Sequence, residues 1–179
     1  MKNLKFVGAF LFAFLVTPSL LAEDIVEIHL KDRLDGDLSE YCLDIAGGFQ
    51  NVDPTRGLQV HTCLSYQGNG ITPDQGLDRD GFDQGEFKVV GFDVCASLDS
   101  LEAGATVQLT SCNGSDAQSL TFAANGNISP KGASDMCLTA GEEVTFGRGG
   151  TSPHQIRTLT LQSCSDANAS RQEWVARQH

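Results

Sequence analysis

Six cysteines at recurring spacings constrain the fold of this chain more than any other feature of its sequence. They bracket three segments, at residues 42–63, 95–112 and 137–164. Each segment opens with Cys, one apolar residue and one polar residue, and passes through a loop that contains turn-forming residues. It then closes with alternating apolar and polar residues that end in the second Cys. This order predicts strand, turn and strand in every segment.

A short triplet follows each cysteine segment. Its sequence is Gln-x-Leu at residues 75–77 and 118–120, and Gln-x-Trp at residues 172–174. The spacing from the triplet Gln to the next opening Cys is 20 residues from Gln75 to Cys95 and 19 residues from Gln118 to Cys137. An internal repeat of about 40 residues built from short strands cannot bury its own apolar face, so the three units must share one core. The sequence therefore predicts an all-β domain of three pseudo-repeats.

The repeat also selects a disulfide pattern. Six cysteines allow 15 pairings, and pairing inside each repeat is the one that preserves the symmetry. Each such bond constrains the unfolded chain by roughly 3 kcal/mol. The predicted disulfides are Cys42–Cys63, Cys95–Cys112 and Cys137–Cys164.

The first 22 residues have the composition of a secretory signal peptide. Lys2 and Lys5 precede an apolar run over residues 6–16, and Ala22 is a small residue at the expected cleavage point. The apolar run is too short to span a bilayer. We therefore expect a cleaved signal, a mature domain over residues 23–179, and secretion to the extracellular space or the periplasm, where the cysteines oxidise.

Charge narrows the classes of partner. Removal of residues 1–22 takes away two lysines and no acidic residue, so the formal net charge changes from −11 to −13. An acidic protein repels phosphate backbones and anionic lipids. We expect no nucleic-acid partner and no membrane insertion, while a protein partner is not defined by the sequence.

The cysteine segments and the Gln triplets resemble the ricin B-type lectin family, whose fold is a β-trefoil of three four-stranded repeats. That family carries Cys-x-Asp, Gln-x-aromatic-x-Cys and Gln-x-Trp in each repeat. Here Gln172-Glu173-Trp174 is intact, whereas Leu77 and Leu120 replace the other two tryptophans. The resemblance implies a β-trefoil in which each repeat has an internal disulfide.

The resemblance also implies one sugar site, in the first repeat. Its candidate residues are Asp44, Gln59, His61 at the aromatic position, and Asp74, with Tyr66 as an alternative ring. A carboxylate accepts charge-assisted hydrogen bonds from neighbouring sugar hydroxyls, and a ring covers the C–H face of the sugar. The second repeat has Ser97 and the third has Thr139 in place of Asp44, so both are interpreted as structural. A galactose-type glycan is the ligand that the family implies.

Several of these residues have a structural interpretation as well. Asp44 follows a strand and can cap a turn through its own backbone. Gln75, Gln118 and Gln172 recur where the other site residues do not, which favours hydrogen bonding in the core. Residues 78–83 space their acids as calcium loops do but lack the full loop pattern, so solvated turn acids are favoured and no cofactor is expected.

No catalytic motif stands out in the sequence. His-Glu-x-x-His and Gly-x-Ser-x-Gly are absent, and three disulfides leave no cysteine as a nucleophile. Paired acids are frequent in so acidic a chain, so their number neither supports nor excludes the acid pair of a glycosidase. The expected function is therefore non-catalytic glycan binding. The alternative is a β-trefoil with decayed sugar sites that binds protein, as an inhibitor or as a subunit of a secreted toxin complex.

Two further structural expectations concern the ends and the middle of the domain. Alternation over residues 26–30 predicts an opening strand, and residues 86–90 predict another. Residues 35–37, Asp-Gly-Asp, predict a turn. Because a closed barrel leaves no free edge, the opening strand should lie beside the last one, near Trp174 and Val175.

Overall fold

The computed structural model describes residues 24–35, 40–68 and 70–178 of the chain. The predicted signal peptide and most of the predicted turn at residues 35–37 lie outside these ranges. The strands of the described chain are β1 (Ile25–Leu30), β2 (Tyr41–Ile45), β3 (Leu58–Thr62), β4 (Leu77–Asp78), β5 (Lys88–Val89), β6 (Val94–Leu98), β7 (Val107–Ser111), β8 (Leu120–Phe122), β9 (Ile128–Pro130), β10 (Met136–Ala140), β11 (Thr145–Phe146), β12 (Gln155–Arg157), β13 (Leu159–Ser163) and β14 (Trp174–Arg177).

The helical segments are short and lie in the connections between strands. Two are α-helical, α1 (Gly147–Gly150) and α2 (Ala169–Gln172). The 3-10 turns are η1 (Phe49–Asn51), η2 (Pro54–Arg56), η3 (Ser65–Gln67), η4 (Phe82–Gln84), η5 (Val90–Phe92), η6 (Asp116–Gln118) and η7 (Asp166–Asn168). No helix in the described ranges has the length and apolar character needed to cross a membrane.

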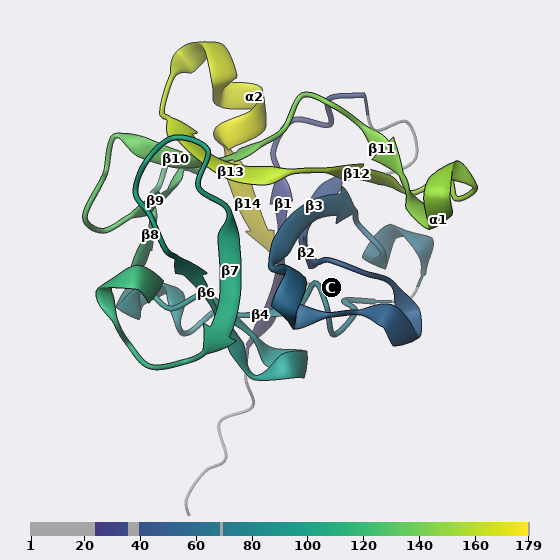
Figure 1. Cartoon of the computed structure of the whole chain (residues 1–179), viewed down its shortest axis with the longest axis horizontal. Coiled ribbons are helices and arrows are strands. Elements are labelled where there is room, and N and C mark those ends of the chain that lie inside the picture. Colours follow the sequence, from purple (N-terminus) through teal and green to yellow (C-terminus); the bar gives the residue numbers. More distant parts are fainter. Residues whose placement is uncertain (1–23, 36–39, 69, 179) are drawn as a thin grey trace, which may run out of the picture.

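The first and last strands lie side by side in the centre of the molecule (Figure 1). β1 pairs antiparallel with β14 over four residues, from Glu27 opposite Arg177 to Leu30 opposite Trp174. β1 also pairs with β2 and β4. The predicted adjacency of the two ends is confirmed, and it removes the unpaired edges that an open sheet would leave.

Three long hairpins, β2–β3, β6–β7 and β10–β13, carry the cysteines. Each hairpin pairs five residues on either strand. The disulfides are Cys42–Cys63, Cys95–Cys112 and Cys137–Cys164, so the predicted pairing is confirmed. The fold is all-β, as predicted, and each disulfide joins cysteines within one predicted repeat.

The core collects the apolar side chains that alternate along these strands. Trp174, Leu77 and Leu120, the third residues of the three Gln triplets, are all buried in it. Trp174 also donates a hydrogen bond from Nε1 to the carbonyl oxygen of Leu138, 3.0 Å away. A leucine therefore takes the packing position of the tryptophan in two of the three places, but it has no group to make this bond.

The strand predicted over residues 86–90 is shorter in the structure. Only Lys88 and Val89 pair as β5, and the chain then turns into η5 at Val90. Gly85 precedes the strand with a φ of 82°, and an added Cβ there would lie 2.9 Å from the carbonyl oxygen of Leu120. Turns on both sides thus limit the strand, which alternation alone does not reveal.

One additional hairpin departs from the simple repeat. The loop between β10 and β13 contains β11 and β12, which pair with each other, and β12 also pairs with β3. In Figure 1 this hairpin, with α1 at its tip, lies beside β3 on the right of the view. A segment of the third repeat thus extends the sheet of the first, next to the predicted sugar site.

Candidate functional site

Asp44 is the centre of the predicted site, and the structure buries it. It lies on β2 opposite Gln59 of β3. Its Oδ1 accepts a hydrogen bond from Gln59 Nε2 at 2.8 Å, and its Oδ2 accepts one from Gln75 Nε2 at 2.9 Å. Only 1% of the residue is exposed. Both carboxylate oxygens therefore have side-chain donors before any ligand arrives.

The electrostatics of Asp44 follow from this burial. Desolvation raises the pKa of its carboxyl well above the usual range, and the nearby charge of Asp74 raises it further. The hydrogen bonds from Gln59 and Gln75 oppose that shift, because they stabilise the ionised form. Asp74 is also largely buried, and its backbone carbonyl accepts a hydrogen bond from Ile45 at 3.1 Å. The structure thus brings Asp44, Gln59 and Asp74 close together.

The three triplet glutamines play one repeated structural role. Each Oε1 accepts a hydrogen bond from the backbone N–H of the residue after the closing cysteine. Each Nε2 donates to the backbone carbonyl oxygen of the residue before that cysteine. The N–H donors are Leu64, Asn113 and Ser165, for Gln75, Gln118 and Gln172 in turn. The carbonyls are those of Thr62, Ser111 and Ser163. The prediction that these glutamines are core hydrogen-bonding groups is confirmed.

Each glutamine also bonds to one further side chain, and here the repeats differ. Gln118 donates to Thr110 Oγ1 at 2.8 Å and Gln172 donates to Thr139 Oγ1 at 2.9 Å. Gln75 donates instead to the carboxylate of Asp44. A neutral hydroxyl satisfies the same donor in the second and third repeats. The carboxylate is thus a special feature of the first.

His61 occupies the predicted aromatic position, but its ring is not an open platform. The residue is 8% exposed, and Nδ1 lies 2.7 Å from the carbonyl oxygen of Thr62. Its ring meets that of His154 edge-on, with 5.3 Å between centroids. Burial lowers the pKa of His61, and His154 lowers it further, while the bond to Thr62 and the charge of Asp74 raise it.

Tyr66, the alternative ring, belongs to a second cluster. It is 48% exposed, and its hydroxyl donates to Glu40 Oε2 at 2.8 Å. The guanidinium of Arg177 lies over its ring, 4.4 Å from the centroid, and also bonds to Glu27 of β1. The structure therefore places Tyr66 at the junction of the first and last strands, where a cation already covers one face of the ring.

Sequence reasoning missed four residues that extend from His61 along the added hairpin and its neighbour η3, which are Gln67, Thr145, His154 and Ile156. Ile156 lies directly opposite His61 in the β3–β12 pairing, and Gln67 Nε2 lies 3.4 Å from His154 Nε2. The extra length of the third repeat was the available signal, since its cysteines are 27 residues apart against 21 and 17.

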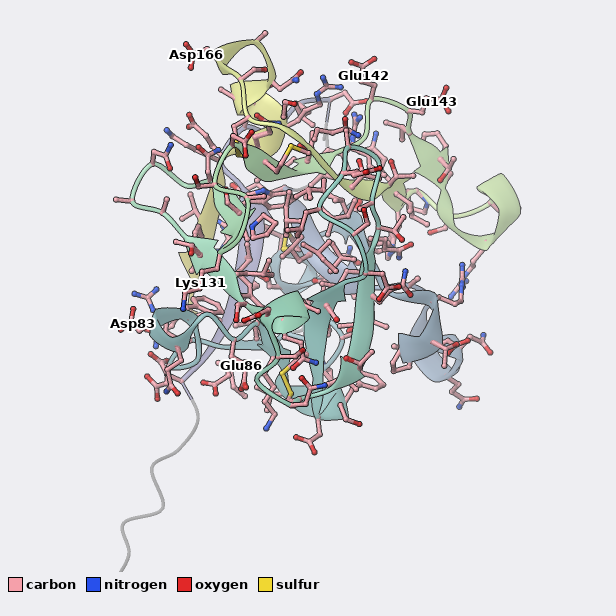
Figure 2. All side chains as sticks on the ribbon, turned by 60° about the vertical axis from the view of Figure 1, so that its left-hand side comes forward. Asp83, Glu86, Lys131, Glu142, Glu143 and Asp166 are labelled. Atoms are coloured by element: carbon pink, nitrogen blue, oxygen red, sulfur yellow. A yellow bond between two sulfur atoms is a disulfide. The ribbon has the colours of Figure 1, made fainter. Side chains whose placement is uncertain are left out.

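Several acidic groups outside the predicted site lie in turns or at the outer surface. Asp78 Oδ1 accepts from the backbone N–H of Asp80 at 3.1 Å, a local bond that suits the interpretation of residues 78–83 as turn acids. Figure 2 shows Asp83, Glu142, Glu143 and Asp166 at the rim of the molecule. Among the described residues, the two sets of potential metal ligands each include the sulfurs of a disulfide, which are not thiolates.

A groove of about 650 Å³ lies away from the predicted site. Its lining includes residues 79, 80, 82 and 83, the β8–β9 turn and residues 174–176 of β14. Phe82 in its wall stacks on Phe87, with ring centroids 4.7 Å apart. None of the five predicted glycan residues lies in its wall.

Comparisons with known proteins identify the family. The model of the ricin-type beta-trefoil lectin domain matches residues 31–145 and, in a second placement, residues 83–179. The chain therefore belongs to the ricin-type β-trefoil lectin family, and its fold is that of a carbohydrate-binding lectin. No curated protein matches the sequence.

Three solved structures show the same fold. An agglutinin from Abrus precatorius has a TM-score of 0.58 and 20% identity over 87% of this chain. The mdaA-1 domain has a TM-score of 0.61 and 14% identity, covering 88% of this chain and 91% of its own. A non-toxic homologue of type II RIPs from Momordica charantia, in complex with alpha-methyl-D-galactoside, has a TM-score of 0.52 and 18% identity over 86% of this chain. This chain spans 48% of the agglutinin chain and 48% of the Momordica chain.

The pKa of His61 gives a testable pH dependence. The folded pKa of His61 is below the unfolded value of 6.5. Between these two pKa values the unfolded state therefore binds more protons than the folded state. The free energy of unfolding should therefore fall as the pH drops through about 6.5 toward the folded pKa. His61→Asn keeps a donor for the Thr62 carbonyl but does not titrate, so its Tm should fall less than that of the parent between about pH 7.5 and 5.5. Equal Tm losses in the two proteins would contradict this assignment.

Proposed function

We propose that this protein is a secreted, non-catalytic lectin with one competent sugar site, formed by the first repeat. The mature domain is residues 23–179, released from a signal peptide at residues 1–22 into the extracellular space or the periplasm. The single observation that carries the proposal is the hydrogen-bonded set of Asp44, Gln59 and Gln75, with Asp74 beside it. Ser97 and Thr139 replace the carboxylate in the other repeats, so those repeats lack the charged acceptor.

The geometry suggests how a sugar engages this set. Gln59 is part-exposed and bonds to Oδ1 of buried Asp44. A carboxylate has about four lone-pair positions, so a sugar hydroxyl can donate to Asp44 once the Gln59 amide turns aside. The freed amide then bonds to a neighbouring hydroxyl of the same sugar. We propose a galactose-type ligand, in line with the galactoside bound to the Momordica structure.

A second candidate function has its own observation. The carboxylate of Asp44 is enclosed, with a donor on each oxygen, and the aromatic position holds a buried His61. Such a site also fits a β-trefoil that has lost sugar binding and uses its surface for a protein partner, as an inhibitor or a toxin subunit. A glycan array with the mature protein separates the two, because a defined glycan hit supports the lectin and silence at high concentration supports the protein-binding subunit.

Asp44→Ala should abolish detectable sugar binding. A site of this kind is expected to bind with millimolar affinity, about 4 kcal/mol, and one charge-assisted contact contributes about 1.5 to 3 kcal/mol of that. Titration calorimetry with the array-selected sugar measures the loss, and circular dichroism confirms that the variant is folded.

Thr139→Ala is the matched control for that experiment. It removes the side-chain acceptor of Gln172 as Asp44→Ala removes that of Gln75, but in a repeat without the carboxylate. It should bind sugar like the parent, and so should Ser97→Ala. A folded Asp44→Ala protein that binds as tightly as the parent would place the sugar elsewhere.

A further inference from the structure

The third repeat contributes a surface beside the sugar site of the first. β12 pairs with β3, with Ile156 opposite His61, and β11 pairs with β12, with Thr145 opposite Ile156. Residues directly opposite each other in adjacent strands share one face of a sheet, and residues two apart on a strand do too. Gln59, His61, Ile156 and Thr145 therefore lie on one continuous face, and His154, just before β12, borders it with its ring 5.3 Å from that of His61.

This added surface is the more accessible part of that face. Asp44 and His61 are buried, whereas Thr145 is exposed and both His154 and Ile156 are part-exposed. Gln67, exposed on η3, contacts His154. The group offers a hydroxyl, an imidazole and an amide, which hydrogen-bond to sugar hydroxyls, and an aliphatic side chain for a sugar's C–H groups.

The hairpin is anchored before any ligand binds. The backbone N–H of Gln155 donates to Thr62 Oγ1 at 2.9 Å. Arg157 is buried, forms an ion pair with Asp35, donates to the carbonyl of Gly141 at 2.8 Å and lies 4.9 Å from the ring centroid of Tyr41. A pre-positioned wall loses little conformational entropy on binding, which favours its use in recognition.

We propose that Thr145, His154 and Ile156, with Gln67, form a second subsite for the next unit of a glycan chain. This inference rests on the proposed sugar site around Asp44 and Gln59 and defines its ligand as an oligosaccharide of at least two units. The ligand is uncharged, because the mature domain, with a formal net charge of −13, repels acidic sugars. The hairpin of the third repeat thus sets the specificity of the site in the first.

A glycan array tests this subsite. It carries neutral monosaccharides, with galactose among them, and the di- and trisaccharides that end in each of them, all at equal density. The parent should bind its best oligosaccharide about tenfold more strongly than the terminal monosaccharide, since one or two added hydrogen bonds supply a factor of that size. His154→Ala and Thr145→Ala should each reduce the ratio of oligosaccharide to monosaccharide binding toward one, while monosaccharide binding stays at the parent level.

Phe146→Ala is the matched control. Phe146 is 49% exposed on the same hairpin, but it pairs with Gln155 and therefore lies on the opposite face of the sheet. The Phe146→Ala variant should therefore keep the parent ratio of oligosaccharide to monosaccharide binding. Equal parent signals for mono- and oligosaccharides would overturn the subsite and leave the sugar site standing. The subsite is also wrong if both folded variants, His154→Ala and Thr145→Ala, keep the parent ratio. Silence of the parent on every glycan would instead contradict the proposed function and this inference with it.

Discussion

A chain that lacks β1, residues Ile25–Leu30, is expected to show no cooperative thermal unfolding transition. The deletion removes the pairing partner of β14, β2 and β4 together. It also removes Val26, Ile28 and Leu30 from the core, where all three are buried. Burial of three aliphatic side chains contributes about 5 to 9 kcal/mol, which is comparable with the whole stability of a typical domain. Thermal unfolding followed by circular dichroism measures the effect.

Single substitutions on β1 give a graded form of the same test. Ile28→Ala should lower the free energy of unfolding by about 2 to 5 kcal/mol, because it empties a fully buried position. Ile25→Ala is the control on the same strand, since Ile25 is exposed, and its cost should stay below about 1 kcal/mol. A deletion variant that melts at the parent temperature would show that β1 is not part of the barrel.

Arg177→Met should destabilise the protein by about 3 kcal/mol. Arg177 of β14 donates from Nε to Glu27 Oε1 at 2.9 Å and from Nη1 to Glu40 Oε2 at 2.6 Å. Glu27 is fully buried, and Ser65 Oγ also donates to its Oε1, at 3.0 Å. Removal of the guanidinium leaves a buried carboxylate whose desolvation is no longer offset by its cation, and that is the costly way to break an ion pair.

The control is a second ion pair between residues next to the first and last strands. Lys31, just after β1, bonds to Glu173, just before β14, at 2.7 Å, but its side chain is mostly exposed. Lys31→Met should therefore cost less than about 1 kcal/mol. The double variant Glu27→Gln with Arg177→Met should recover part of the loss, because it also removes the buried charge. Chemical unfolding of the four proteins measures these differences, and equal losses for Arg177→Met and Lys31→Met would contradict the assigned role of Glu27.

The sequence was most informative where a pattern repeats. The cysteine pair and the Gln triplet each occur three times at similar spacings. Agreement among the three copies excluded the disulfide pairings that break the repeat. The disulfides, the structural role of Gln75, Gln118 and Gln172, and the adjacency of the first and last strands are confirmed. Strand lengths were less predictable, as β5 shows, because turns on both sides decide where pairing stops.

Accessibility in the candidate site did not follow from the sequence. A family motif specifies that Asp44, Gln59 and Asp74 come together, and they do. Whether the carboxylate of Asp44 faces solvent depends on what covers it, and Gln59 and Gln75 satisfy it from both sides. Tyr66 is close to His61 in the chain, yet it packs under Arg177, a residue more than one hundred positions away.

The sequence by itself thus predicted the repeat and the disulfide pairing, because these depend on local periodicity and on residues at fixed spacings, while the β-trefoil followed from the resemblance of those motifs to a known family. Only the tertiary structure decided that Asp44 and His61 are buried and that the hairpin of β11 and β12 joins the sheet of the first repeat. Those features depend on contacts between segments that are distant in the chain. The short strands Thr145–Phe146 and Gln155–Arg157 have too few residues for a periodic signal. The second of them pairs with β3, where Ile156 lies opposite His61, a residue 95 positions earlier.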